Sequence, residues 1–171
     1  MYTGFWTLDI GLALKKLKTF PEVKAVILAQ MWLAYNNDVE YARLEEFAMH
    51  INSMGKTLFI LTDTPCYKYS PNDIVARSKI ITPRDKSILA EHYKQTEGEY
   101  DRMQGEINRR IQEVCRKTGA VLIPIHRAFF ENNGYLAFDA QDGRLIPLYS
   151  DNSHLSHEGS LRLSAFVISA L

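Results

Sequence analysis

The chain has 171 residues, 46% hydrophobic and 23% charged, which is long enough for one domain with a buried core and typical of a folded protein. Lysine and arginine together number 20, as do aspartate and glutamate, so the formal net charge is zero and gives no reason to expect nucleic acid or an anionic membrane as a partner. No apolar run reaches the roughly 18 residues that span a bilayer, and the first residues lack the pattern of a secretory signal, so composition leaves the localisation unknown.

The first half of the chain alternates between predicted helices and strands. Residues 7–19 are predicted to form a helix, and residues 23–29 form a β-branched, nearly continuous apolar run that is typical of a strand buried on both faces. After a loop at residues 30–37, Asp38 is predicted to cap a second helix, which Gly55 ends. Apolar residues recur in this helix at the spacing of a single face: Leu44, Phe47, Ala48 and Ile51.

The next part contains two further strands and a long helical pattern. Residues 57–61 and 120–125 are short apolar runs that predict the second and third strands. Between them, roughly residues 85–118 have a helical pattern with a break predicted near Gly98, and Gly119 is predicted to end it. The apolar stripe of its second half comprises Tyr100, Met103, Ile107, Ile111 and Val114.

The connection at residues 126–156 is unusually long, and long ordered loops in compact domains tend to carry function. An Asp-Gly pair at residues 142–143 lies between two apolar-rich stretches, residues 135–138 and 145–149, and therefore predicts a β-hairpin. Residues 161–171 are predicted to form a last amphipathic helix.

Alternation of helices and strands predicts an α/β fold, with a parallel, flavodoxin-like sheet in a three-layer α/β/α arrangement and a single domain over residues 1–171. In such sheets the ligand site forms beyond the carboxyl ends of the strands. The loops at residues 30–37, 62–69 and 126–156 each follow a predicted strand, so they are expected to meet on one side of the sheet.

Asp151 and His154 lie three residues apart just before the last helix. A carboxylate at this spacing can orient an imidazole, the arrangement that activates a serine in hydrolases and acyltransferases. Two other interpretations remain: Asp151 caps a turn while His154 is an ordinary surface residue, or both bind a metal with His157. The second is the less favoured, and no metal or cofactor is predicted. Three further histidines lie in separate elements and are predicted to be structural: His50, His92 and His126.

Residues 142–156, read as Asp-Gly-Arg-Leu-Ile-Pro-Leu-Tyr-Ser-Asp-Asn-Ser-His-Leu-Ser and followed by Gly159, resemble the last block of SGNH (GDSL-type) hydrolases. More narrowly, they resemble the SGNH domain fused behind membrane acyltransferase-3 proteins that O-acetylate bacterial surface polysaccharides. Residues 26–32 and 62–65 are similar to the ends of two strands in that subgroup. The resemblance covers most of the chain from about residue 8 onward.

The resemblance implies that His154 is a general base and that Asp151 orients it. It also implies an O-acetyltransferase or esterase domain acting on a carbohydrate or acyl-ester substrate, without cofactor or metal. The implied partner is a membrane acyltransferase domain in a parent protein, and the implied location is outside the cytoplasm. The physical reading agrees, because a histidine near its ordinary pKa can accept a hydroxyl proton at neutral pH.

The sequence departs from the family at the nucleophile. The family takes its serine from a Gly-Asp-Ser motif on the first strand, but none of the nine glycines here is followed by aspartate. We therefore expect the first two strands of the family fold to be absent and the nucleophile to be unknown. Three serines of the irregular segment show no sign of activation: Ser70, Ser78 and Ser87. The family's oxyanion block is not matched either, and its nearest equivalents, Asn36 and Asn37, are better explained as a turn and a helix cap.

Three functional hypotheses follow, and enzyme activity of the chain itself is uncertain. The chain is a C-terminal part of an acyl-transfer enzyme lacking the nucleophile, a non-catalytic carbohydrate-binding or assembly remnant, or an esterase with a relocated serine. In the second case Trp32 and Tyr35 are candidates to stack on a sugar, although core or rim packing is the commoner use of such aromatics. With its neighbouring strands absent, the strand at residues 23–29 would be an apolar edge, which predicts self-association.

The two cysteines, Cys66 and Cys115, permit one disulfide but are equally compatible with reduced, partly buried thiols.

Overall fold

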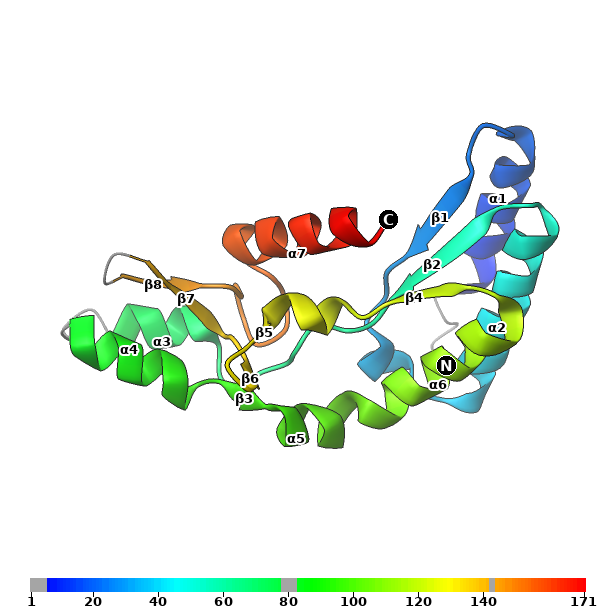
Figure 1. Ribbon diagram of the computed structural model, residues 1–171. Coiled ribbons are helices and arrows are strands. Elements are labelled where there is room, and N and C mark those ends of the chain that lie inside the picture. The colour runs from blue at the N-terminus through cyan, green and yellow to red at the C-terminus, as the bar shows by residue number, and fades with distance from the viewer. Residues whose placement is uncertain (1–5, 78–82, 142–143) are drawn as a thin grey trace. The chain divides into compact units, whose positions relative to one another are not determined.

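The computed structural model describes residues 6–77, 83–141 and 144–171 (Figure 1). The chain divides into two compact units, which are described separately below. Unit 1 comprises Met1–Thr62 and Ile107–Ile123, and unit 2 comprises Asp63–Glu106 and Pro124–Leu171. The strands predicted from hydrophobic runs lie in unit 1, whereas Asp151 and His154 lie in unit 2.

Unit 1 contains a parallel sheet of three strands in the order β1-β2-β4. Strand β1 is Ala25–Leu28, β2 is Thr57–Leu61 and β4 is Val121–Ile123. Both neighbouring pairs are parallel, with Ile27 opposite Phe59. The predicted α/β class and the parallel pairing of these three strands are therefore confirmed. The prediction was possible because strands separated by helices usually pair in parallel.

Unit 1 also contains three helices: α1 (Trp6–Thr19), α2 (Asp38–Ser53) and α6 (Glu106–Thr118). In the core of unit 1, one face of the sheet packs against α2 and α6, and the residues with no exposed surface are Leu44, Ile51, Ile60 and Ile111. The other face is more open within unit 1, since Ile27 is 47% exposed and Val121 is 40% exposed. The expectation that residues 23–29 are buried on both faces is thus wrong within unit 1: β1 is an edge strand whose exposure alternates along its length.

The edge position of β1 leads to a prediction about association. The unmodified chain should elute as a self-associated species in size exclusion with light scattering, and Ile27→Lys should shift it toward monomer, because a charge on an edge strand opposes strand addition. Leu12→Lys is the matched control, since Leu12 is an equally exposed apolar residue (53%) on α1. A sharp monomer peak of the unmodified chain at high concentration would contradict the prediction.

The helix boundaries of unit 1 follow local signals in the sequence. Gly55 and Gly119 follow the ends of α2 and α6 with φ of +69° and +77°, as predicted for glycines that close helices. The N-cap of α2 was misassigned by one residue: the cap is Asn37, whose side chain accepts a hydrogen bond from the Glu40 amide at 3.1 Å, and Asp38 is the first helical residue. The short 3-10 helix η1 (Trp32–Tyr35) precedes this cap.

Unit 2 is built from short elements and two small antiparallel sheets, of order β3-β6-β5 and β7-β8. Its helices are α3 (Pro71–Arg77), α4 (Pro83–His92), α5 (Glu97–Tyr100), the 3-10 helix η3 (Ile125–Phe129) and α7 (His157–Ala170). Its strands are β3 (Gln95–Thr96), β5 (Phe130–Glu131), β6 (Gly134–Tyr135), β7 (Phe138–Gln141) and β8 (Arg144–Pro147). Its fully buried aromatic core comprises Tyr100, Phe129, Tyr135 and Tyr149.

The predicted hairpin is confirmed in its strands, because β7 and β8 pair antiparallel; the Asp-Gly pair itself lies outside the described residues. A second hairpin, between β5 and β6, was not predicted. Its turn uses Asn132 and Asn133, both in the left-handed region with φ of +50° and +64°, a conformation that asparagine tolerates better than most residues.

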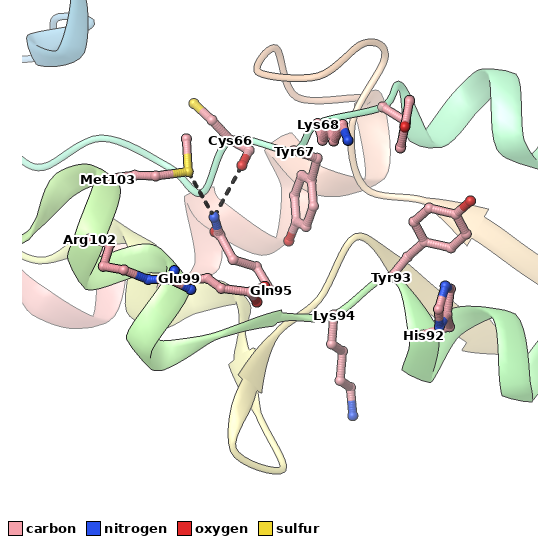
Figure 2. Close-up of a pocket in the computed structure, with 11 residues that line it drawn as sticks. Cys66, Tyr67, Lys68, His92, Tyr93, Lys94, Gln95, Glu99, Arg102 and Met103 are labelled. Carbon is pink, nitrogen blue, oxygen red and sulfur yellow. Dashed lines mark hydrogen bonds between the residues drawn. The ribbon is translucent and has the colours of Figure 1, made fainter.

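The long helical pattern at residues 85–118 is interrupted earlier than expected. The chain leaves α4 after His92, pairs briefly with β6 as β3, and restarts at Thr96, which forms a capping box with Glu99. Gln95 is consequently buried, and its Nε2 donates to the Cys66 carbonyl at 3.2 Å and to Met103 Sδ at 3.5 Å (Figure 2). The Thr-Glu-Gly-Glu pattern could have predicted the start of α5 at Thr96. The sequence contains no comparable signal for the pairing of β3 with β6.

A π-helical turn, Asp101–Gly105, joins α5 to α6 and changes which side chains face inward. Met103, expected in the apolar stripe, is 47% exposed, whereas Gln104 is 1% exposed and donates to the Thr64 carbonyl at 3.1 Å. The wider π turn shifts the helical register, and such turns are often found near functional sites. Among the described residues, none of the helices is both long and apolar enough to cross a membrane.

Candidate active site

The loop between β8 and α7 is held closed by its own backbone. Tyr149 and Leu155 form an antiparallel bridge, and the Ser150 amide donates to the His154 carbonyl at 2.8 Å. At the end of the loop, the Ser156 hydroxyl donates to the Pro147 carbonyl at 2.7 Å and accepts from the Gly159 amide at 3.1 Å, which caps α7. Because both ends are anchored, the tip of the loop has a defined conformation.

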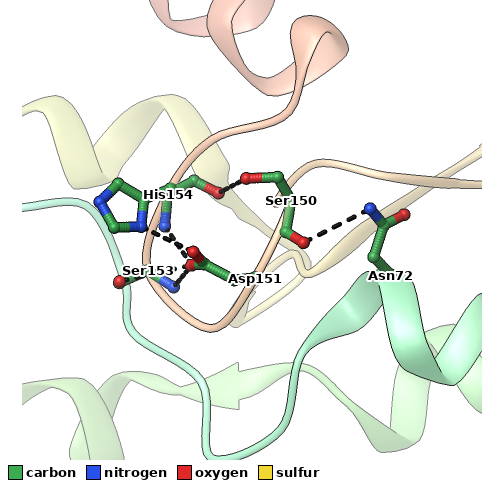
Figure 3. A network of polar contacts seen from close by, with 5 residues as sticks. All are labelled: Asn72, Ser150, Asp151, Ser153 and His154. Atoms are coloured by element: carbon green, nitrogen blue, oxygen red, sulfur yellow. Dashed lines mark hydrogen bonds and ion pairs between the residues drawn. The ribbon is translucent and has the colours of Figure 1, made fainter.

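Asp151 and His154 make direct contact at this tip (Figure 3). Asp151 Oδ2 lies 2.7 Å from His154 Nδ1, while Oδ1 accepts hydrogen bonds from the amides of His154 at 2.7 Å and Ser153 at 2.8 Å. These amides, that of His154 first, lower the pKa of the Asp151 carboxyl to about 2. The carboxylate is therefore charged at neutral pH and fixed in position by the backbone before it contacts the imidazole.

This geometry combines two interpretations that the sequence left as alternatives. Asp151 does form a turn with the following amides, and the same carboxylate accepts a hydrogen bond from His154 Nδ1. With Nδ1 protonated, Nε2 is the unprotonated nitrogen, and in Figure 3 it points away from Asp151. The His154 side chain is 77% exposed, so Nε2 is accessible to a hydroxyl group. The pair has the arrangement of a general base with its orienting carboxylate.

The His154 tautomer is directly testable by NMR. In long-range ¹H–¹⁵N correlation spectra above the pKa of the ring, His154 should show a protonated Nδ1 and an unprotonated Nε2, because Asp151 accepts from Nδ1. Asp151→Ala should return the ring to the mixture of tautomers seen in free histidine, in which protonated Nε2 is prominent. His157, an exposed neighbour without a carboxylate contact among the described residues, serves as the internal control. A His154 spectrum that does not change in Asp151→Ala would contradict the assignment.

A nucleophile for this base is not found in the described part of the chain, where no serine hydroxyl hydrogen-bonds to the His154 ring. The hydroxyls of Ser150 and Ser153 instead donate to the His154 carbonyl and to Asp151 Oδ1. Ser70 lies at the start of α3 and accepts from the Asp73 amide. Ser78 and the side chain of Ser87 lie outside what the structure describes.

The thiol of Cys66 is not an activated substitute. Cys66 is a free cysteine, and burial, together with the charges of Asp63 and Asp151, raises its pKa to about 11. It is therefore protonated at neutral pH, and a thiol is a much weaker nucleophile than a thiolate. Cys115 is also free and buried, so the structure has reduced cysteines.

Two of the three loops expected to meet do so within unit 2. The Tyr67 amide donates to the Asn152 carbonyl at 2.8 Å, which joins the segment after β2 to the loop of Asp151 and His154. Asn72 Nδ2 donates to the Ser150 carbonyl at 3.4 Å. The sequence analysis did not identify Tyr67 or Asn72 as supports of the site, since main-chain contacts between distant segments leave no residue pattern.

The remaining candidate residues lie in unit 1. Trp32 is 1% exposed, and its Nε1 donates to the Leu61 carbonyl at 2.7 Å, so in this structure its ring packs in the core and offers no face to a sugar. Tyr35 is half-buried at the end of η1. Asn37 caps α2 and Asn36 Oδ1 accepts from the Tyr41 hydroxyl, which agrees with the turn-and-cap interpretation of this pair.

Two of the other histidines, His126 and His50, have structural surroundings, whereas His92, also predicted to be structural, lines a cavity of unit 2. His126 is 8% exposed and stacks on Tyr100 at 4.7 Å between ring centroids, and burial lowers its pKa to about 4. His50 Nδ1 contacts the Glu46 carbonyl of its own helix. A group of three or more histidine, cysteine or acidic side chains suited to a metal does not occur in the ranges that the structure describes.

The family of the chain follows from a match that spans nearly all of it. The family described as SGNH domain (fused to AT3 domains) matches residues 10–169. The chain belongs to this SGNH family. The Asp-x-x-His pair of its last loop is therefore found in a family context and not only as a short motif.

A solved structure supports the same fold for this SGNH domain. The Salmonella ser. Paratyphi A lipopolysaccharide acetyltransferase periplasmic domain is similar with a TM-score of 0.66 and 16% sequence identity, over 94% of this chain and 60% of that chain. The predicted α/β SGNH-like fold is thus confirmed. The SGNH chain spans about 60% of the length of this structural relative. A search of curated protein sequences found no match.

Proposed function

We propose that this SGNH domain takes part in acyl-ester transfer or hydrolysis on carbohydrate hydroxyls, as an O-acetyltransferase or esterase domain. The observation that carries the proposal is the 2.7 Å contact between His154 Nδ1 and Asp151 Oδ2, with the carboxylate fixed by two backbone amides and Nε2 left accessible. The two amide hydrogen bonds account for the turn, whereas the additional contact between Oδ2 and Nδ1 is the arrangement that serves a hydroxyl nucleophile.

In the proposed reaction, a serine hydroxyl attacks the carbonyl carbon of an acyl ester, and His154 Nε2 takes the hydroxyl proton. The alcohol portion of the ester leaves and takes that proton from His154, so the serine now carries the acyl group. A sugar hydroxyl or water then attacks this acyl-serine and loses its proton to His154. The bond between the acyl group and the serine breaks, and the serine oxygen takes the proton back from His154. Asp151 stabilises the imidazolium that forms in each step. We propose that the serine is supplied by a Gly-Asp-Ser segment, which this chain does not contain.

The family and the structural relative support the carbohydrate setting. The family is described as fused to AT3 domains, and the relative is named as the periplasmic domain of a lipopolysaccharide acetyltransferase. We therefore propose a membrane acyltransferase-3 domain as partner and a location outside the cytoplasm.

The test begins with the coding DNA upstream of Met1, where we expect an in-frame or frameshifted segment encoding Gly-Asp-Ser. The protein that joins both parts should hydrolyse p-nitrophenyl acetate. His154→Ala should lower kcat by about 10⁶-fold and Asp151→Asn by about 10⁴-fold, as loss of the base or of its orienting group does in serine proteases. His157→Ala is the matched control and should retain activity. Absence of such a segment upstream, or hydrolysis that survives His154→Ala, would overturn the proposal.

A non-catalytic carbohydrate-binding role is the second candidate. It is favoured by the absence of a serine hydroxyl at the His154 ring among the described residues and by a tyrosine-lined cavity in unit 2. The structure does not favour Trp32 as the binding residue, because its ring is buried. Glycan binding by the 171-residue chain together with no upstream Gly-Asp-Ser segment would favour this role over catalysis.

A further inference from the structure

Unit 2 contains a cavity of about 430 Å³ that no part of the proposed reaction uses (Figure 2). Its walls come from two segments distant in sequence, the stretch after β2 and the stretch from the end of α4 to the π turn. We call it the tyrosine cavity; the residues that matter for its chemistry are Tyr67, Lys68, Tyr69, Tyr93, Gln95 and Arg102. A second cavity of about 540 Å³ shares Tyr69 and Tyr93 with it, so the two adjoin.

The three tyrosines that line the cavity differ in exposure and in their contacts. Tyr67 is 9% exposed and its hydroxyl donates to the Tyr135 carbonyl at 3.1 Å, so this wall is fixed. Tyr93 is half-buried and packs edge-on against Phe138 at 6.2 Å between ring centroids. Tyr69 is 57% exposed at the rim, so its ring is accessible to a ligand. Flat aromatic faces beside polar groups suit sugar rings, whose C–H faces are apolar and whose edges carry hydroxyls.

The charges that line the cavity have an excess of unpaired cations. Within the described residues neither Lys68 nor Arg102 forms an ion pair, whereas Lys94 is paired with Glu91 at 2.6 Å. Lys68 Nζ lies 5.2 Å from the Tyr69 ring centroid, which places its charge beside the exposed aromatic face. The acidic side chain of the lining, Glu99, accepts hydrogen bonds from the amide and hydroxyl of Thr96, which lower its pKa with a contribution from the nearby charge of Arg102. Arg102 Nε also donates to the Gly98 carbonyl at 3.2 Å. Because the lining holds three cationic side chains and one carboxylate, it keeps an excess of positive charge for an anionic ligand.

Gln95 supplies a further polar group to the lining. It is 8% exposed, and while its Nε2 donates to Cys66 and Met103, its Oε1 has no hydrogen-bond partner. Both partners of Nε2, Cys66 and Met103, belong to residues that line the cavity, so a ligand that moves them changes the surroundings of the Gln95 side-chain amide.

We propose that the tyrosine cavity binds an acidic saccharide, with a sugar ring against Tyr69 and Tyr93 and its anionic group held by Lys68 and Arg102. The anionic group is a carboxylate or a phosphate, and the adjoining second cavity takes a neighbouring ring. The Tyr67 amide bonds to the Asn152 carbonyl, so one wall of the cavity is attached to the loop of Asp151 and His154. An acidic saccharide would be the substrate class of the proposed acyl transfer, and that role rests on the proposed function. Binding of the saccharide to the cavity does not depend on the reaction.

The test is an NMR titration of the ¹⁵N-labelled 171-residue chain with four probes: trigalacturonic acid, glucose 6-phosphate, the neutral trisaccharide maltotriose and inorganic phosphate. At least one of the two acidic sugars should shift the Gln95 side-chain amide and bind at least about tenfold more tightly than maltotriose and than inorganic phosphate, because ring and charge are both needed. The comparison of trigalacturonic acid with glucose 6-phosphate identifies the anionic group.

Variants locate the site. Lys68→Ala and Arg102→Gln should each weaken binding about tenfold, and Tyr69→Ala about fivefold, whereas Tyr69→Phe should bind normally. Arg116→Gln, an exposed arginine of unit 1, is the matched control and should bind normally, as should His154→Ala. These rim residues are exposed, and amide spectra of each variant confirm folding.

Equal binding of acidic and neutral probes would overturn the proposal, as would unchanged binding in both Lys68→Ala and Arg102→Gln. An equal loss in Arg116→Gln would also overturn it, because that result indicates attraction to overall charge. If the protein that joins both parts binds the acidic sugar normally but has no His154-dependent esterase activity, the proposed reaction is refuted and this site is left intact.

Discussion

Replacing Gly159 with alanine is expected to lower the free energy of unfolding of unit 2 by about 3 kcal/mol or more. Gly159 is the third residue of α7, and its amide donates to the Ser156 hydroxyl that caps this helix. A Cβ atom at this position would lie 2.0 Å from the Leu148 carbonyl oxygen. Because the obstacle is backbone, no side-chain rotation can remove the clash.

The Leu148 carbonyl also accepts the Ser156 amide at 3.0 Å, which closes the loop of Asp151 and His154. Moving that carbonyl to admit a methyl group would break this bond. We therefore expect Gly159→Ala to disturb the Asp151–His154 contact as well as stability, and this explains in physical terms why a glycine follows the Asp-x-x-His-Leu-Ser pattern at this distance.

The change in the free energy of unfolding can be measured by amide hydrogen exchange and by chemical denaturation. The denaturation is monitored by the near-ultraviolet circular dichroism of the buried tyrosines of unit 2. Gly98→Ala is the matched control: Gly98 lies in α5 with open space around it, and alanine there should stabilise the helix by about 0.5–1 kcal/mol. If Gly159→Ala unfolds with the same free energy as the parent chain, the close approach of α7 to Leu148 is not real.

Lowering the pH from 7 to 5 is expected to destabilise unit 2 by about 2 kcal/mol through His126, and the effect near pH 4 should reach about 3 kcal/mol. His126 is 8% exposed, stacks on Tyr100 and lies 5.9 Å from the Tyr135 ring centroid. Burial, aided by the charge of Arg127, lowers its pKa from 6.5 to about 4. The folded protein therefore holds this imidazole neutral at pH values where the unfolded chain protonates it.

The direction follows from proton binding. Between pH 6.5 and about pH 4 the unfolded chain binds more protons at this position than the folded chain, so stability falls as the pH falls. Above pH 6.5 both states are neutral and the effect disappears. The difference between the two pKa values, multiplied by about 1.4 kcal/mol for each pH unit, gives a limit of about 3.5 kcal/mol well below pH 4, of which about 3 kcal/mol is reached near pH 4.

Denaturation measured from pH 7 to pH 5 avoids the range in which ordinary carboxyl groups titrate. In His126→Phe, which retains a ring to pack on Tyr100, most of this pH dependence should disappear whatever the absolute stability of the variant. His50→Gln, at an exposed position on α2, should keep it. An unchanged pH dependence in His126→Phe would show that His126 is not the responsible group.

The parts of the fold that the sequence predicted are those specified by neighbouring residues. The three parallel strands follow from short apolar runs, and the ends of α2 and α6 from glycines that adopt positive φ. The interruption of the long helical pattern was placed too late, because the pairing of Gln95 with Tyr135 joins positions 40 residues apart. Helical periodicity carries no information about a strand partner at that distance.

The candidate site divides in the same way. Asp151 and His154 are three residues apart, so their contact depends on the local turn and was visible as a motif before any fold was known. Trp32 was a candidate to stack on a sugar, with core or rim packing the commoner alternative, and its burial against the Leu61 carbonyl depends on how η1 meets β2. Burial is a property of the assembled chain and not of a residue's neighbours in sequence.

By itself, then, the sequence determined the α/β class, the SGNH resemblance and the pairing of Asp151 with His154, because each arises from periodicity or from contacts within a few residues. Only the tertiary structure decided that Tyr67 supports the loop of that pair, that Gly159 must lack a side chain, and that Lys68 and Arg102 line one cavity with three tyrosines. These features require segments far apart in the chain to pack together, and long-range packing is encoded by the whole sequence and not by any stretch of it.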